Sequence, residues 1–126
     1  MFNGADDNAS GVSGVLELAP AFATLPQKPR RSVMFVTFSG EEKGLLGSRA
    51  MVTRELFPVD RVAFMLNLDM IGRNPDRALQ VFGDGYVRGL RDVVELANAG
   101  PSVELDFAGS SYAGNSDHDA FHDLDI

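Results

Sequence analysis

Cysteine and tryptophan are both absent from this sequence of 126 residues. The lack of cysteine excludes disulfide bonds and zinc sites built from thiolates. Positive charge is also scarce, because 11 lysines and arginines face 18 acidic residues and leave a net charge of −7. That balance argues against nucleic acid or an anionic membrane as a partner. No apolar run approaches the roughly 20 residues that are needed to span a bilayer.

What the sequence does contain is an alternation of apolar runs and helical patterns, with 44% hydrophobic residues overall. Two nearly continuous apolar runs favour strands that are covered on both faces, as in a parallel sheet. With two shorter runs, strands are predicted over 32–38, 62–68, 79–82 and 103–107. Helices are expected over 12–22, 45–57 and 87–97. This alternation predicts an α/β fold, a three-layer sandwich with a mostly parallel central sheet.

Individual residues predict where the helices begin and end. Asn8 or Ser10 is suited to cap the first helix. Pro20 predicts a kink or an early end of the same helix, since proline inside a helix costs about 3 kcal/mol. Pro58 is expected to stop the second helix, and Gly100 followed by proline to stop the third.

A pair of glutamates, Glu41 and Glu42, follows the first long apolar run. Gly40 precedes the pair and Gly44 follows it closely, which predicts a tight turn. Neighbouring residues point in different directions, so the two carboxylates are expected to have different tasks. One could bind a metal while the other faces a water on that metal. By itself, such a pair is more often an exposed acidic turn.

Other acidic residues accompany this pair. Glu41, Glu42 and Asp69 all follow predicted strands, and functional groups gather at the carboxyl ends of strands in such sheets. Asp7 and His118 lie in polar loops. Clustered carboxylates repel one another unless a cation neutralises them. Carboxylates with one imidazole per metal suit zinc, manganese or cobalt.

Four segments in order resemble the co-catalytic di-zinc aminopeptidases, a family that includes bacterial leucyl aminopeptidases and aminopeptidase Y-like enzymes. The segments are Gly-Ala-Asp-Asp-Asn-Ala-Ser-Gly at 4–11, Ser-Gly-Glu-Glu-Lys-Gly-Leu-Leu-Gly-Ser at 39–48, Asn-Leu-Asp-Met-Ile-Gly-Arg at 67–73, and Ser-Asp-His at 116–118 with Phe121. The resemblance extends from residue 3 to the end of the chain.

The resemblance implies a role for each of five residues. Asp7 would bridge two zinc ions, Glu42 and His118 would complete one site, and Asp69 would bind the other ion. Glu41 would be the general base that activates water. The implied reaction is hydrolysis of the N-terminal bond of a peptide with a free N-terminus. The resemblance also favours a secreted or periplasmic location.

The resemblance carries structural expectations as well. The peptide bond between Asp7 and Asn8 is often cis in this family. Asp6, Met70 and Asp117 lie beside the implied ligands and would act at most in support of them.

One part of the family pattern is missing, namely the histidine of an upstream His-x-Asp motif. The six residues before Asp7 contain no histidine. We therefore expect 1–126 to be an incomplete metallopeptidase catalytic domain that also lacks a downstream core strand. On this view, about one zinc binds tightly per chain instead of two, and the exposed sheet edges permit self-association.

Several alternatives stay open. His118 and His122 are spaced like the two histidines of a zincin helix, although Asp119 stands where that motif has glutamate. Tyr112 could donate to an oxyanion, and Arg73 could bind substrate or form a salt bridge. The function could instead be that of a related zinc amidase, such as a carboxypeptidase, a deacylase or a glutaminyl cyclase-like acyltransferase. A non-catalytic, receptor-like homologue is the alternative from another class.

Overall fold

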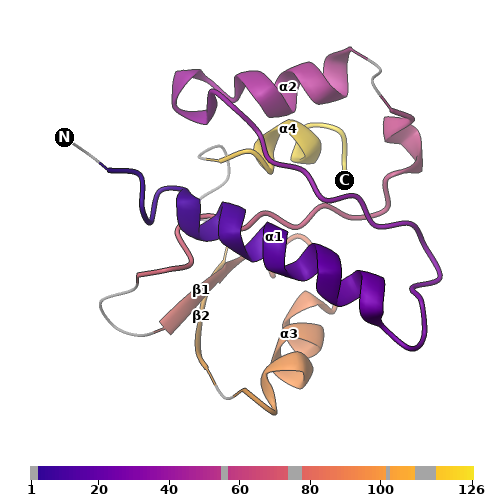
Figure 1. Cartoon of the computed structure of the whole chain (residues 1–126), viewed down its shortest axis with the longest axis vertical. Helices are drawn as coiled ribbons and strands as arrows, with labels where there is room; N and C mark the ends of the chain where they lie inside the picture. Colours follow the sequence, from indigo (N-terminus) through magenta and orange to yellow (C-terminus); the bar gives the residue numbers. More distant parts are fainter. Residues whose placement is uncertain (1–2, 55–56, 74–77, 102, 110–115) are drawn as a thin grey trace. The chain divides into compact units, whose positions relative to one another are not determined.

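The computed structural model describes residues 3–54, 57–73, 78–101, 103–109 and 116–126. It divides into two compact units, one made of residues 1–72 with 116–126 and the other of residues 73–115 (Figure 1). Both helices and strands occur, so the predicted α/β class is confirmed. Among the described residues, none of the helices has the length and apolar character needed to cross a membrane.

The first helix of the first unit, α1, spans Ala9–Thr24. Asn8 caps it, as predicted, because its Oδ1 accepts a hydrogen bond of 3.0 Å from the backbone nitrogen of Gly11. Of the kink or early end expected at Pro20, the early end is wrong, since the helix continues to Thr24. In its last turn, the Thr24 hydroxyl donates to the Pro20 carbonyl over 3.0 Å.

The glutamate pair and the second helix follow in the same unit. Glu41–Lys43 form a 3-10 helix, and α2 spans Leu46–Thr53. This helix is shorter than the predicted 45–57, of which residues 55 and 56 lie outside the described part of the chain. A further 3-10 turn covers Val59–Arg61, and the short helix α4 covers Asp119–His122.

A small core joins α2 to α4. Its buried hydrophobic residues are Leu45, Ala120 and Phe121, the last of which is only 4% exposed. The Phe38 ring packs against Phe121 with the ring centroids 6.2 Å apart. Ser48 is fully buried and donates to the Leu45 carbonyl over 3.2 Å. This core keeps the glutamate turn close to the segment that carries His118.

The two long apolar runs are not strands in this structure, which corrects the prediction for 32–38 and 62–68. A strand needs a neighbour to complete its ladder, and among the described residues no backbone hydrogen bonds pair either run with another segment. Side chains that were expected to be buried are instead exposed, with Met34 at 61% and Leu66 at 66%. The self-association expected through such surfaces stays a prediction.

The second unit is a strand-helix-strand arrangement. Strand β1 spans Ala78–Phe82, α3 spans Leu90–Asn98, and β2 spans Glu104–Gly109. The two strands pair in parallel with Ala78 opposite Glu104. These three elements confirm the shorter strands and the third helix predicted from the sequence. In the described residues the one sheet has two strands, so the predicted three-layer sandwich stays a prediction.

Gly11 provides a test of how α1 packs within the first unit. A Cβ atom at this position would lie 2.0 Å from the carbonyl oxygen of Leu68, a backbone atom that cannot rotate away. We expect Gly11→Ala to lower the free energy of unfolding by about 1–3 kcal/mol or more, measured by urea denaturation. Gly100→Ala is the matched control, because nothing lies within 4 Å of its added Cβ. Equal stability of the two variants would contradict this packing.

Candidate metal centre

The glutamate pair occupies a turn whose shape depends on its glycines. Gly40 and Gly44 have φ angles of 72° and 98°, in the left-handed region that glycine adopts without penalty. The backbone nitrogens of Gly44 and Leu45 both donate to the Glu41 carbonyl over 2.9 Å. The predicted tight turn is therefore confirmed, and it places Glu41 and Glu42 in one short 3-10 helix.

A third glycine of the same motif brings α2 directly onto the preceding segment. The Gly47 nitrogen donates to the Ser39 carbonyl over 2.9 Å. A Cβ atom at Gly47 would lie 2.8 Å from the Ser39 nitrogen and from its carbonyl oxygen. Any larger residue would separate the start of α2 from Ser39, and the glutamate turn between them would change shape.

The loop of Asp7 is joined to the segment of Asp69 by a single side chain. The Asn8 Nδ2 donates to the Leu68 carbonyl over 3.0 Å, and the Asn8 Oδ1 accepts from the Met70 nitrogen over 3.2 Å. The peptide bond between Asp7 and Asn8 is cis, as the resemblance implied. Asp7 and Asp69 therefore lie on two segments that are hydrogen-bonded to each other.

Two neighbours of Asn8 extend this junction. The Asp6 Oδ1 accepts from the Gly72 nitrogen, and the Ser10 hydroxyl oxygen accepts from the Ile71 nitrogen, each over 3.0 Å. The Ser10 hydroxyl also donates to the Asp6 carbonyl over 2.6 Å. The Asp6 carboxylate thus binds the backbone of Gly72, and its expected support of the ligands stays a prediction.

Ser116 connects the last motif to Asp69. Its hydroxyl donates to the Asp69 Oδ2 and accepts from the Asn67 Nδ2, both over 2.6 Å. Ser116 is 8% exposed while Asn67 and Asp69 are partly buried, so this chain of bonds is partly shielded from water. Sequence reasoning assigned no role to Ser116 or Asn67, although both stand within the motifs that carry the family resemblance.

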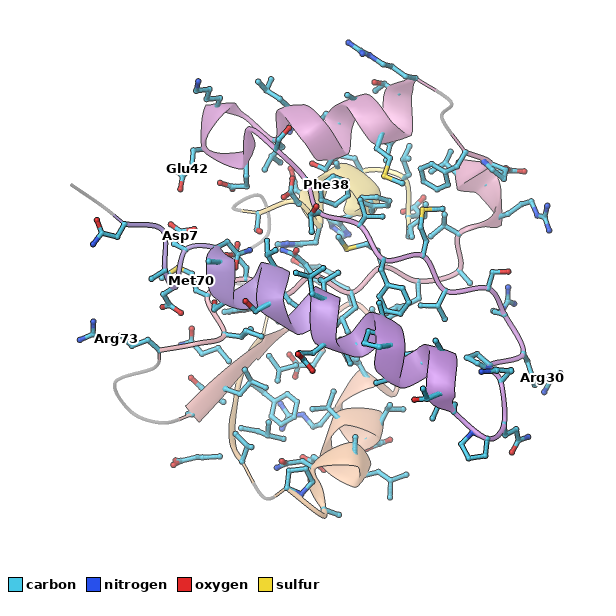
Figure 2. All side chains as sticks on the ribbon, in the orientation of Figure 1. Asp7, Arg30, Phe38, Glu42, Met70 and Arg73 are labelled. Atoms are coloured by element: carbon cyan, nitrogen blue, oxygen red, sulfur yellow. The ribbon has the colours of Figure 1, made fainter. Side chains whose placement is uncertain are left out.

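Electrostatics show which carboxylates gather around Glu41. Burial raises the pKa of Glu41, and the negative charges of Glu42, Asp117, Asp69 and Asp7 raise it further. Carboxylates from four separate segments thus act on one side chain. In Figure 2, Asp7, Glu42 and Met70, the neighbour of Asp69, lie toward the same edge of the view.

The segment of Asp117 and His118 contributes a buried carboxylate. Asp117 is 9% exposed, and within the described residues its Oδ1 has no hydrogen-bond partner. His118 is partly buried and precedes α4 directly. Among the groups that shift the pKa of Glu41, the structure includes Asp117 but not His118.

The carboxylates around Glu41 repel one another, and a cation would relieve that repulsion. The residue types of the proposed set, carboxylates with one imidazole, fit zinc and also manganese or cobalt. In the part of the chain that the structure describes, no three histidine, aspartate or glutamate side chains approach closely enough to hold a metal ion. The ligand set of Asp7, Glu42, Asp69 and His118 therefore stays a prediction.

The remaining candidates contribute less. His122 is exposed and lies in α4 one turn after His118. The zincin arrangement needs a third ligand, and no such group of three occurs in the described residues. Tyr112 lies outside the residues that the structure describes. Arg73 is exposed, and Figure 2 shows its side chain extending away from the ribbon.

Comparison with known proteins decides the family. The model of peptidase family M28 matches residues 2–126. The chain belongs to this family. The resemblance to zinc aminopeptidases that the four motifs indicated is thereby confirmed. No solved structure matches the chain.

Three relatives of this M28 chain illustrate the range of sequence identity and coverage. It is 32% identical over 128 residues to aminopeptidase YwaD of Bacillus subtilis, covering 98% of the chain and 27% of that protein. It is 33% identical over 130 residues to leucine aminopeptidase 2 of Trichophyton equinum, covering 94% and 25%. It is 44% identical over 71 residues to a probable zinc metalloprotease of Pyrenophora tritici-repentis, covering 56% and 16%. The chain thus spans about a quarter or less of the length of these relatives.

Proposed function

We propose that residues 1–126 contribute to the catalytic domain of a zinc-dependent aminopeptidase. The observation that carries this proposal is the set of carboxylates around Glu41. Burial raises the pKa of Glu41, and the charges of Glu42, Asp117, Asp69 and Asp7 raise it further. Family membership and the names of two relatives, both aminopeptidases, support it. The substrate is a peptide with a free N-terminus.

The residues that would hold zinc are those that the motifs indicated. Asp7, Glu42 and His118 would bind one ion, and Asp69 with Asp7 would bind a second ion in the complete domain. We expect about one tightly bound zinc in this chain by itself. Zinc at such a site lowers the pKa of water and polarises the carbonyl of the scissile bond.

Glu41 is the proposed general base. Its carboxylate would take a proton from the attacking water and pass that proton to the amine that leaves. A base for this step works best when its pKa is closer to neutral than that of an ordinary glutamate. In the metal-free chain, burial and then the neighbouring negative charges raise the Glu41 pKa. Of these two causes, burial does not depend on the charges that bound zinc would neutralise. Glu41 and Glu42 lie in one 3-10 turn between two glycines, and the proposal gives them separate tasks.

The fold of the complete domain is proposed to be a three-layer sandwich with a mostly parallel sheet. The parallel pair of β1 and β2, joined through α3, is the kind of unit from which such sheets are built.

A substrate panel tests the proposed activity. The complete protein should hydrolyse one or more aminoacyl-p-nitroanilides, lose this activity on treatment with a chelator, and regain it when zinc is restored. The same substrates with an acetylated amine are the control and should not be cleaved. Equal cleavage of free and acetylated substrates would favour a zinc amidase of another type. Activity that survives complete removal of metal would overturn the zinc mechanism.

A further inference from the structure

The side chain of Asn8 holds the two segments that carry Asp7 and Asp69. Its Oδ1 accepts hydrogen bonds from the backbone nitrogens of Gly11, over 3.0 Å, and Met70, over 3.2 Å. Its Nδ2 donates to the Leu68 carbonyl over 3.0 Å. Asn8 is partly buried, so these bonds are partly protected from exchange with water.

The Asn8 side chain forms hydrogen bonds with the backbone on both sides of Asp69. Leu68 precedes Asp69 and Met70 follows it, and each gives one backbone group to the Asn8 amide. Asp7 is the residue directly before Asn8. One rigid planar amide therefore fixes how far the backbone of Asp7 can move from the backbone of Asp69.

The Asp7 carboxylate takes no part in these contacts between the two segments. The side chains that hold the backbone of 68–72 come from every second residue, Asp6, Asn8 and Ser10. Within the described residues, the Asp7 carboxylate takes part in no hydrogen bond, and Asp7 is exposed. Asp7 thus remains available to a ligand while its neighbours make the structural contacts.

We infer that Asn8 is a positioning residue that sets the spacing of the Asp7 and Asp69 carboxylates for zinc. This inference rests on the proposed function. Metal sites tolerate deviations of only about 0.2 Å in ligand distance, and ligands must be held by the residues around them. Loss of a group that orients a ligand typically weakens metal affinity by about 10- to 100-fold.

The simpler role for Asn8 is that of a cap for α1, which needs only the bond from Gly11. Serine caps helices about as well as asparagine does. Its side chain is shorter, however, and has no amide with which to reach the Leu68 carbonyl and the Met70 nitrogen at once. Asn8→Ser therefore keeps the cap, adds no charge and removes the link to the Asp69 segment.

The test measures the zinc affinity of the complete protein by competition with a chelator. We expect Asn8→Ser to bind zinc about 10- to 100-fold more weakly than the unchanged protein. In the metal-free protein, the Met70 amide should exchange its hydrogen faster, because its acceptor is lost. Ser13→Ala is the control, since it removes a side-chain bond of 2.7 Å to the Ala9 carbonyl in the same helix and should change neither quantity.

A second variant keeps the inference testable if Asn8→Ser fails to fold. Asn8→Asp retains a cap and an acceptor for Met70, but it sets a carboxylate oxygen against the Leu68 carbonyl. Its added negative charge alone would strengthen zinc binding, whereas the positioning role predicts weaker binding. Zinc affinity that is unchanged within about twofold in Asn8→Ser, or increased in Asn8→Asp, overturns the inference while the proposed function stands. An unchanged protein that binds no zinc overturns the proposed function itself.

Discussion

Replacement of Glu41 by glutamine should lower the turnover number of the complete protein by about 10²- to 10⁴-fold, the range for loss of a general base. Glutamine keeps the size and shape of the side chain but cannot accept the proton of the attacking water. The zinc content should not change, because Glu41 is not a proposed ligand. Steady-state kinetics with an aminoacyl-p-nitroanilide and elemental analysis of the same preparation measure both quantities.

The metal-free protein supplies a control for this variant that does not depend on activity. The pKa of Glu41 is raised in the folded state, so folding favours its protonated form. The charge of Glu41 therefore destabilises the folded state once the pH has risen through that pKa. Glu41→Gln should be more stable than the unchanged protein at neutral pH, and the difference should fade as the pH falls below the usual range of glutamate. Normal turnover in Glu41→Gln would remove the mechanism proposed for this residue.

Replacement of Glu42 by glutamine should instead act through the metal. Loss of a group that only orients a ligand typically weakens zinc affinity by roughly 10- to 100-fold. Removal of a ligand itself should weaken it by more. Activity should fall at low free zinc and recover in part as the zinc concentration is raised. Titration of activity against buffered zinc, with Glu41→Gln alongside, separates the two glutamates.

The opposite pattern for these two variants would exchange their roles. If Glu42→Gln kept its zinc and lost turnover while Glu41→Gln lost zinc, Glu42 would be the base. If both changes were nearly silent, within about 0.5 kcal/mol of stability and with normal activity, the pair would be an ordinary acidic surface turn.

Local patterns in the sequence were sufficient to predict several elements. The glycines at 40 and 44 predicted the turn that carries Glu41 and Glu42, since a left-handed backbone is inexpensive only for glycine. Asn8 was one of the two caps expected for α1, and the strand-helix-strand order of β1, α3 and β2 followed from apolar spacing. Each of these features depends on residues that are close together in the chain.

Features that depend on distant residues were not predicted. The runs at 33–38 and 62–68 have strand composition, but composition cannot supply the hydrogen-bonded neighbours that make a strand. The links from Asn8 to Leu68 and from Ser116 to Asp69 join residues 60 and 47 positions apart. No periodic pattern in the sequence predicts such contacts.

The candidate site also combines features that the sequence predicted with features that it did not. The acidic residues Asp7, Glu42 and Asp69 were singled out by sequence, and the structure places their charges within reach of Glu41. Asp117, which sequence reasoning treated as a neighbour of His118, also acts on Glu41 and is buried. Spacing in the sequence did not indicate that the charge of Asp117 would act on Glu41.

The most direct measurement is the anomalous scattering of a crystal of the complete protein, grown with zinc and recorded on both sides of the zinc absorption edge. The proposal predicts an anomalous peak within coordination distance, about 2.0–2.2 Å, of carboxylate oxygens of Asp7 and Glu42, with the His118 imidazole as a further ligand. It also predicts that Asp69 binds a second zinc beside the first. Zinc bound elsewhere, with Asp7 and Glu42 both free of metal, would contradict the account.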